Sequence, residues 1–170
     1  RQFPKFDVAD DAFANGAIGF RTFNAAAQFD NVKVSAPTLS NGPTYTNQLL
    51  ANAADPHVLF HQGVYYLYCT ASDNGLPVYT STDLVQWKPH TSFALRKEDS
   101  WGDRWFWAPD VIERNVTFYM AYAVEEHLAI ATADNPLGPF VQAVQAPMHA
   151  DTKEIDGHFF VDEDGKVYFY

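Results

Sequence analysis

The segment "AADPHVLFHQGVYYLYCT", residues 53–70, decides the fold of this chain. Its second half is an aromatic and apolar run from Val64 to Cys69, which is typical of a β-strand. An acidic residue, Asp55, stands near the start of the segment and is followed directly by Pro56. Because proline restricts the residue before it to extended geometry, we expect an extended Asp55 whose carboxylate points in a fixed direction.

The same order of an acid, an apolar strand, a polar turn and an aromatic strand occurs three times. The acids are Asp55, Asp110 and Asp156, and their spacings are 110 − 55 = 55 and 156 − 110 = 46 residues. The blades of a β-propeller, each a four-stranded sheet, repeat at roughly 40 to 50 residues. No helical periodicity is apparent in this region. We therefore predict an all-β chain containing the first two to three blades of a propeller, and a small open sandwich is the alternative.

A linker divides the chain into two parts. Residues 35–48 are rich in Pro, Gly, Ser, Thr and Asn, and we place a boundary near residue 37, between a domain at 1–37 and a domain at 38–170. Strands are expected in the second domain at 64–71, 76–82, 116–124 and 127–133, with a hairpin at 158–170. An incomplete ring of blades would leave unpaired strand edges, so we expect the chain to belong to a longer polypeptide.

Composition narrows the range of partners. The 170 residues carry a net charge of −10 without a cluster of Lys and Arg, which argues against nucleic acid or an anionic membrane surface. No run approaches the roughly 18 apolar residues of a membrane span. The six histidines show no spacing suited to zinc, and the one cysteine, Cys69, is expected to be a buried small hydrophobe. A neutral partner such as a carbohydrate is compatible with these features.

The three repeated acids are candidates for one site. The first strand of each propeller blade lines the central channel, so Asp55, Asp110 and Asp156 are expected to converge at one mouth of it. Several carboxylates in one pocket can divide acid and base roles, as the hydrolysis of glycosidic bonds requires. His57, two residues after Asp55, is a further candidate for this pocket. The competing interpretation is that acids beside Pro or Gly only cap turns.

The segment "WGDRWFWAPDV", residues 101–111, holds three Trp within seven residues. Beside a carboxylate pocket we interpret Trp107 as a stacking wall for a sugar ring, with packing in the core as the alternative. Side chains alternate in direction along a strand, so at most one of Trp105 and Phe106 joins Trp107, and Trp105 is our candidate. Asp110 is expected either to contact sugar hydroxyls or to complete the turn after its neighbouring proline.

Five motifs occur in an order that points to a known family: "ADPHV", "STDLVQW", "WAPDV", "ADNPLGPF" and "IDGHFFVDEDGKVYF". Together they resemble glycoside hydrolase family 43, whose fold is a five-bladed β-propeller, over about residues 50–170. The resemblance implies an inverting hydrolase that acts on arabinose- or xylose-containing glycans in the periplasm or outside the cell. It also allows a structural calcium ion in the channel, whose ligands the sequence does not show.

The resemblance assigns roles to two of the acids. By the family pattern Asp55, in "ADP", is the general base, and Asp156, in "IDG", tunes the pKa of the catalytic acid and orients the sugar. The family's catalytic acid is a Glu at the start of a later blade, beyond residue 170. The family often has Pro or Ala after the second acid, where Gly157 and His158 stand here, a departure that concerns subsites more than the reaction. Four glutamates do not match the position of the acid: Glu125, Glu126, Glu154 and Glu163.

Residues 1–34 carry a separate resemblance. The stretch "GAIGFRTFNAAAQFDNVKV" is similar to the closing strands of a concanavalin-like jelly-roll domain. This implies a β-sandwich domain ahead of the propeller.

Two other functions stay open for the propeller. One is a non-catalytic carbohydrate-binding domain, whose acids only form hydrogen bonds to a glycan. The other is a related five-bladed hydrolase that acts on fructans or mannosides, of which the fructan enzymes retain the configuration of the sugar.

Overall fold

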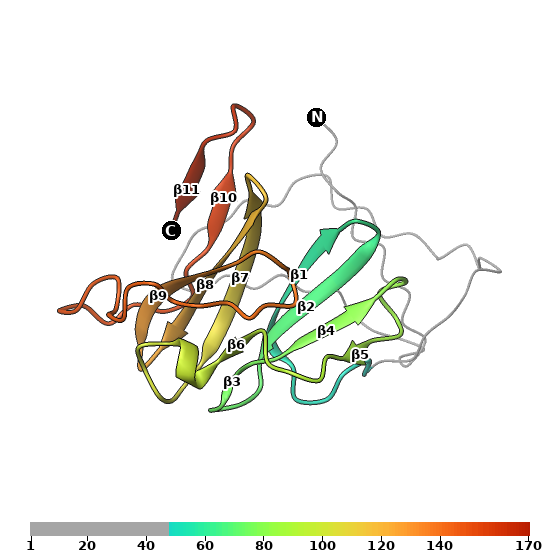
Figure 1. The fold of residues 1–170 in the computed structure, drawn as a ribbon, viewed down its shortest axis with the longest axis horizontal. Helices are drawn as coiled ribbons and strands as arrows, with labels where there is room; N and C mark the ends of the chain where they lie inside the picture. Colours follow the sequence, from blue (N-terminus) through green and yellow to red (C-terminus); the bar gives the residue numbers. More distant parts are fainter. Residues whose placement is uncertain (1–47) are drawn as a thin grey trace, which may run out of the picture. The chain divides into compact units, whose positions relative to one another are not determined.

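The computed structural model describes residues 48–170. The predicted jelly-roll strands, nearly all of the linker and the boundary near residue 37 lie outside the described residues. From residue 48 onward the chain forms β-sheets, coloured from cyan to red in Figure 1. The one helical element of this part is a short 3-10 turn, η1 (Lys97–Asp99), so the predicted all-β class is confirmed there. No helix between residues 48 and 170 is long and apolar enough to cross a membrane.

The first sheet contains four antiparallel strands in the order β1-β2-β4-β5. They are β1 (Ala54–His61), β2 (Val64–Thr70), β4 (Val78–Ser81) and β5 (Lys88–Pro89). The aromatic run of β2 lies inside the sheet, between β1 and β4. We call this sheet blade 1, because it has the four strands that the sequence predicts for a propeller blade.

The second sheet, which we call blade 2, has the order β7-β8-β9. Its strands are β7 (Trp107–Arg114), β8 (Thr117–Val124) and β9 (His127–Ala133). Val141 forms an antiparallel bridge to Thr132 of β9, so a short fourth segment completes this sheet at the edge. The first strands of the two blades, β1 and β7, lie side by side (Figure 1). This is the arrangement expected of strands that line a common axis.

Two shorter strand pairs accompany the blades. β10 (Phe159–Val161) pairs with β11 (Val167–Phe169), which confirms the predicted hairpin at 158–170. β3 (Gly75–Leu76) pairs with β6 (Leu95–Arg96). The β10–β11 hairpin repeats the first two strands of blades 1 and 2, and we call it the third hairpin.

The hydrophobic core lies between blades 1 and 2. Tyr68 and Val78 of blade 1 are almost completely buried, and so are Val111, Met120 and Tyr122 of blade 2. Burying large apolar side chains is the main favourable contribution to folding. Since both sheets contribute to one core, their first strands are held at a fixed separation, and so are the residues at the starts of these strands.

Cys69, on β2, is fully buried, as predicted. Burial, and to a smaller extent the negative charge of Asp55, raises the pKa of the Cys69 thiol from 9.0 to about 11. Because the thiolate is the reactive form of cysteine, this side chain is a packing residue and not a nucleophile.

Candidate active site

The opening strands of the two blades and of the third hairpin can be aligned by their hairpin turns. Counting four residues back from the last backbone pair before each turn gives His57 in blade 1, Asp110 in blade 2 and His158 in the third hairpin. The last pairs are His61–Val64, Arg114–Thr117 and Asp162–Lys166. His57, Asp110 and His158 therefore occupy equivalent positions.

This alignment corrects the predicted equivalence of the three acids. Asp55 and Asp156 are equivalent, but the matching position in blade 2 is Ala108, and Asp110 lies two residues further along. The spacings become 108 − 55 = 53 and 156 − 108 = 48 residues, which are more even than those between the acids. The prediction was wrong because it aligned residues by charge, whereas the strand register aligns the Asp-Pro of blade 1 with the Ala-Pro of blade 2.

The backbone is kinked at all three equivalent positions. Asp55, Ala108 and Asp156 have φ angles of 48°, 44° and 62°, in a left-handed region that is uncommon for residues other than Gly. In blades 1 and 2 the strand register shifts across these positions, as in a β-bulge. A bulge turns the side chain that it carries in a new direction and is frequent next to active sites. The expectation of an extended Asp55 is therefore wrong, because the bulge overrides the preference that Pro56 imposes.

A single hydroxyl group connects Asp55 to blade 2. The Thr70 hydroxyl donates a hydrogen bond of 2.7 Å to Oδ2 of Asp55 and accepts one of 2.8 Å from the backbone N–H of Ala108. Thr70 ends β2 and pairs with Ala54, directly before the acid. The Asp55 side chain is exposed, so its carboxylate is both accessible and held. Thr70 was not among the predicted site residues, although its place at the end of the strand opposite Asp55 was the available signal.

Asp156 stands at the same place before the third hairpin, and it is also exposed. The next residue, Gly157, is buried, and a Cβ atom there would lie 2.5 Å from the ring of Phe169 and 2.9 Å from Leu128. In this chain the ring of Phe169 occupies the space that a side chain at position 157 would need. The departure from the Pro or Ala of the family pattern thus has a packing reason.

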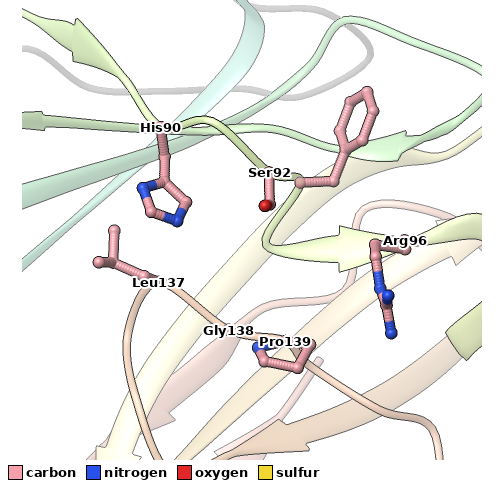
Figure 2. A pocket seen from close by; sticks show the side chains of 7 residues that line it. His90, Ser92, Arg96, Leu137, Gly138 and Pro139 are labelled. Carbon is pink, nitrogen blue, oxygen red and sulfur yellow. The ribbon is translucent and has the colours of Figure 1, made fainter.

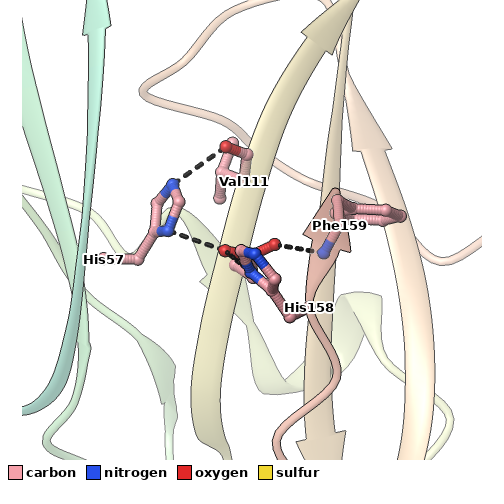
Figure 3. Close-up of polar contacts among 5 residues, drawn as sticks. His57, Val111, His158 and Phe159 are labelled. Atoms are coloured by element: carbon pink, nitrogen blue, oxygen red, sulfur yellow. Dashed lines mark hydrogen bonds and ion pairs between the residues drawn. The ribbon is translucent and has the colours of Figure 1, made fainter. Parts of the chain in front are cut away.

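Asp110 lies at the centre of a cluster that joins the two blades and the third hairpin. Its Oδ1 is 2.8 Å from Nδ1 of His57 and 3.3 Å from Nδ1 of His158. Its Oδ2 accepts a hydrogen bond of 2.8 Å from the backbone N–H of Phe159. Nε2 of His57 lies 2.9 Å from the Val111 carbonyl oxygen. Figure 3 shows His57 reaching from β1, and His158 from the residues before β10, toward this carboxylate on β7.

The cluster keeps Asp110 ionised. The residue is only 7% exposed, and burial alone would raise the pKa of its carboxyl group. The hydrogen bonds from His57 and from the Phe159 N–H, with the charges of His57 and His158, outweigh burial and lower that pKa below 3.8. Both carboxylate oxygens are occupied by protein groups, which favours a structural connection over the predicted contact with sugar hydroxyls.

The aromatic segment places two Trp side chains together. The rings of Trp105 and Trp107 are stacked, with centroids 5.8 Å apart and planes at 15°. Phe106 points the other way, into the core, where it stacks on Tyr122. Trp105 and Phe106 thus point in opposite directions, as the predicted alternation requires, and Trp105 is the one that contacts Trp107. Arg104 covers Trp105, with its guanidinium carbon 4.3 Å from the ring centroid, and a cation–π contact of this kind helps to fix the ring.

The residues between 48 and 170 do not fit the channel calcium that the family resemblance allows. No three of their His, Cys, Asp and Glu side chains are grouped so that they could hold a metal ion. Calcium requires six to eight oxygen ligands, whereas the cluster around Asp110 combines one carboxylate with two imidazoles. No step of the reaction is therefore assigned to a metal.

A surface pocket of about 180 Å³ lies elsewhere on this part of the chain. His90, Ser92 and Arg96 line it together with Leu137 and Pro139 (Figure 2). None of the predicted site residues lines this pocket. We therefore place the candidate active site at the starts of the inner strands.

The fold and the site together define a class of protein. Antiparallel sheets with carboxylates at the starts of the inner strands of blade 1 and of the third hairpin are suited to a propeller-type glycoside hydrolase. Residues 45–170 match the sequence model of the family described as Glycosyl hydrolases family 43. The chain belongs to glycoside hydrolase family 43, whose members are inverting enzymes.

Individual relatives agree with this assignment. A thermostable family-43 glycoside hydrolase is 41% identical with a TM-score of 0.66, and the match covers 74% of this chain and 44% of that one. The endo-1,4-beta-xylanase of Bacteroides thetaiotaomicron VPI-5482 is 39% identical with a TM-score of 0.65, covering 70% of this chain and 42% of that one. The beta-xylosidase of Xylanibacter ruminicola is 33% identical over 75 residues, which are 41% of this chain and 23% of the xylosidase. The chain thus spans less than half the length of these relatives.

Other matched proteins are named for activities on arabinose-containing glycans. They are called alpha-L-arabinofuranosidase, endo-arabinase and arabinoxylan arabinofuranohydrolase.

Proposed function

We propose that the protein hydrolyses arabinosyl or xylosyl linkages with inversion of configuration, and that Asp55 is the general base. The Asp55 carboxylate carries this proposal, because it is exposed, stands at a bulge that sets its direction, and is held by the Thr70 hydroxyl. The names of the matched relatives support arabinose- and xylose-containing glycans as the substrate class.

The proposed reaction is a single displacement at the anomeric carbon. Asp55 takes a proton from a water molecule while the water oxygen bonds to that carbon, and the bond from the carbon to the leaving oxygen breaks. A Glu from outside these 170 residues, in a later blade of a five-bladed propeller, protonates the leaving oxygen. Asp156 orients the sugar and tunes the pKa of that Glu.

The stacked pair of Trp105 and Trp107 is proposed to form the apolar wall of the site. The face of an aromatic ring packs well against the CH face of a sugar. Trp107 precedes Ala108, whose N–H binds the same hydroxyl that holds Asp55. The wall and the base are therefore joined by two consecutive hydrogen bonds. A net charge of −10 favours a neutral glycan over an acidic one.

The configuration of the product tests this function. Proton NMR of the complete protein acting on an aryl xyloside and an aryl arabinofuranoside is expected to show release of the sugar with the opposite anomeric configuration. Retained configuration would contradict the proposal and favour a fructan-type hydrolase. Binding of xylo- and arabino-oligosaccharides without any turnover would also contradict it and favour a non-catalytic carbohydrate-binding propeller.

Thr70→Val is expected to lower kcat about tenfold with a smaller change in KM, because a hydrogen bond to a charged group is lost. Valine keeps the shape of threonine but neither donates to Asp55 nor accepts from the Ala108 N–H. Thr70→Ser keeps the hydroxyl and is the matched control, whose kcat should stay within about twofold of the wild type. A loss in Thr70→Ser without a loss in Thr70→Val would mean that the methyl group, and not the hydroxyl, is what matters at this position.

A further inference from the structure

We propose that Asp110 is a positioning residue that sets the placement of Asp55 relative to Asp156 through its contacts to His57 and His158. This inference rests on the proposed function, in which both of these acids act on the sugar. In this inference Asp110 acts through His57 and His158 and does not contact the substrate.

The spacing of the residues is the first support. His57 follows Asp55 by two residues, and His158 follows Asp156 by two residues. Both histidines direct Nδ1 at one oxygen of Asp110, at 2.8 Å and 3.3 Å. Asp55 and Asp156 are equivalent in the repeat. Each is followed two residues later by a histidine that contacts the carboxylate of Asp110 in blade 2.

The second oxygen of Asp110 strengthens the link to Asp156. It accepts the N–H of Phe159 at 2.8 Å, and Phe159 directly follows His158. The backbone and a side chain at the start of the third hairpin are thus both tied to β7 (Figure 3). These contacts fix the start of β10, close to Asp156 in the sequence.

Burial and charge make the cluster rigid. Asp110 is 7% exposed, and charge-assisted hydrogen bonds in such an environment are short and strong. Both ring nitrogens of His57 face acceptors, Oδ1 of Asp110 and the carbonyl oxygen of Val111. The ring of His57 is therefore held through both of its nitrogens.

The chain contains a matched control for this cluster. Nδ1 of His61 lies 2.8 Å from Oε2 of Glu113, and this pair also joins β1 to β7. It has the same chemistry but stands at the hairpin end of the strands, four residues beyond His57. Removing it should affect the packing of the two blades without moving Asp55 or Asp156.

The test compares steady-state kinetics of variants of the complete protein on an aryl xyloside and an aryl arabinofuranoside. Asp110→Asn keeps the volume and an acceptor for the Phe159 N–H but loses the charge between the histidines. We expect kcat to fall about 10- to 100-fold with a smaller change in KM, since misplacement of reacting groups by about 1 Å has an effect of this size. Glu113→Gln should leave kcat within about twofold of the wild type.

Variants of His158 separate positioning from folding, because its side chain is 63% exposed and its replacement is compatible with the fold. His158→Ala should lower kcat about tenfold and add no further loss when Asp110→Asn is already present. His158→Asn, whose amide can donate from the place of Nδ1, should restore most of the activity.

Four results would overturn the inference. A raised KM with unchanged kcat in Asp110→Asn would mean that Asp110 binds the sugar. Independent, additive losses from Asp110→Asn and His158→Ala would mean that the two residues are not linked. Equal losses of kcat from Asp110→Asn and Glu113→Gln would mean that the cluster around Asp110 only stabilises the packing of the two blades and does not position the acids. If the wild-type protein hydrolyses neither glycoside, the proposed function itself fails and the inference fails with it.

Discussion

Asp55→Asn in the complete protein is expected to lower kcat by about 10² to 10⁴, the usual contribution of a general base. Asparagine has nearly the shape of aspartate and can still accept the Thr70 hydroxyl at the position of Oδ2. It cannot take a proton from water, so the chemical step fails while the site keeps its geometry. Binding of xylo- or arabino-oligosaccharides, measured by titration calorimetry, should persist.

The control for this variant is another aspartate that stands in a turn. Oδ1 of Asp164 accepts the N–H of Lys166 at 2.9 Å in the turn of the third hairpin, as expected for a turn residue. Asp164→Asn should leave kcat unchanged. Full activity of Asp55→Asn would contradict the assignment of the base, and the interpretation of Asp55 as a simple turn cap would then be preferred.

Neighbouring aromatic residues should give opposite results when each is replaced by alanine. Phe106 is 1% exposed and stacks on Tyr122, so Phe106→Ala should destabilise the domain by about 3 to 5 kcal/mol. For a domain of this size the loss corresponds to a decrease of roughly 10 °C in the midpoint of thermal unfolding, measured by calorimetry.

Trp105→Ala should instead change binding. Trp105 is 37% exposed and stacks on Trp107, so its loss removes support from the proposed sugar wall with less effect on the core. We expect KM to rise about three- to tenfold and the unfolding midpoint to fall by much less than in Phe106→Ala. The stacked pair would have to be assigned to the core if Trp105→Ala lowered the midpoint as much as Phe106→Ala and left KM unchanged.

Most of the strands were predictable because their signal is local, but the strand predicted at 76–82 is divided between β3 and β4, which belong to different sheets. The apolar and aromatic runs of β2, β8 and β9 lie within a residue or so of their predicted ranges. The choice of Trp105 over Phe106 as the partner of Trp107 also followed from a local rule, the alternation of side chains along an extended backbone.

The bulge and the cluster behind it were not predictable by the same means. A β-bulge depends on the pairing of two strands, and a sequence aligned by its acids gives Asp110 the place that belongs to Ala108. Alignment of the triplets "DPH", "APD" and "DGH" would have placed His57, Asp110 and His158 in register. Their meeting around one carboxylate is a long-range contact between strands, which no single stretch of the sequence records.

The hydrogen bond from Thr70 makes the two oxygens of the Asp55 carboxylate unequal. Because the Thr70 hydroxyl oxygen accepts the Ala108 N–H, the hydroxyl proton points toward Oδ2 of Asp55. Among residues 48–170, Oδ1 has no hydrogen-bond partner, so its lone pairs are open to solvent. In the proposed reaction the proton from water therefore goes to Oδ1. A carboxylate that would otherwise be symmetric thus offers the attacking water one basic oxygen.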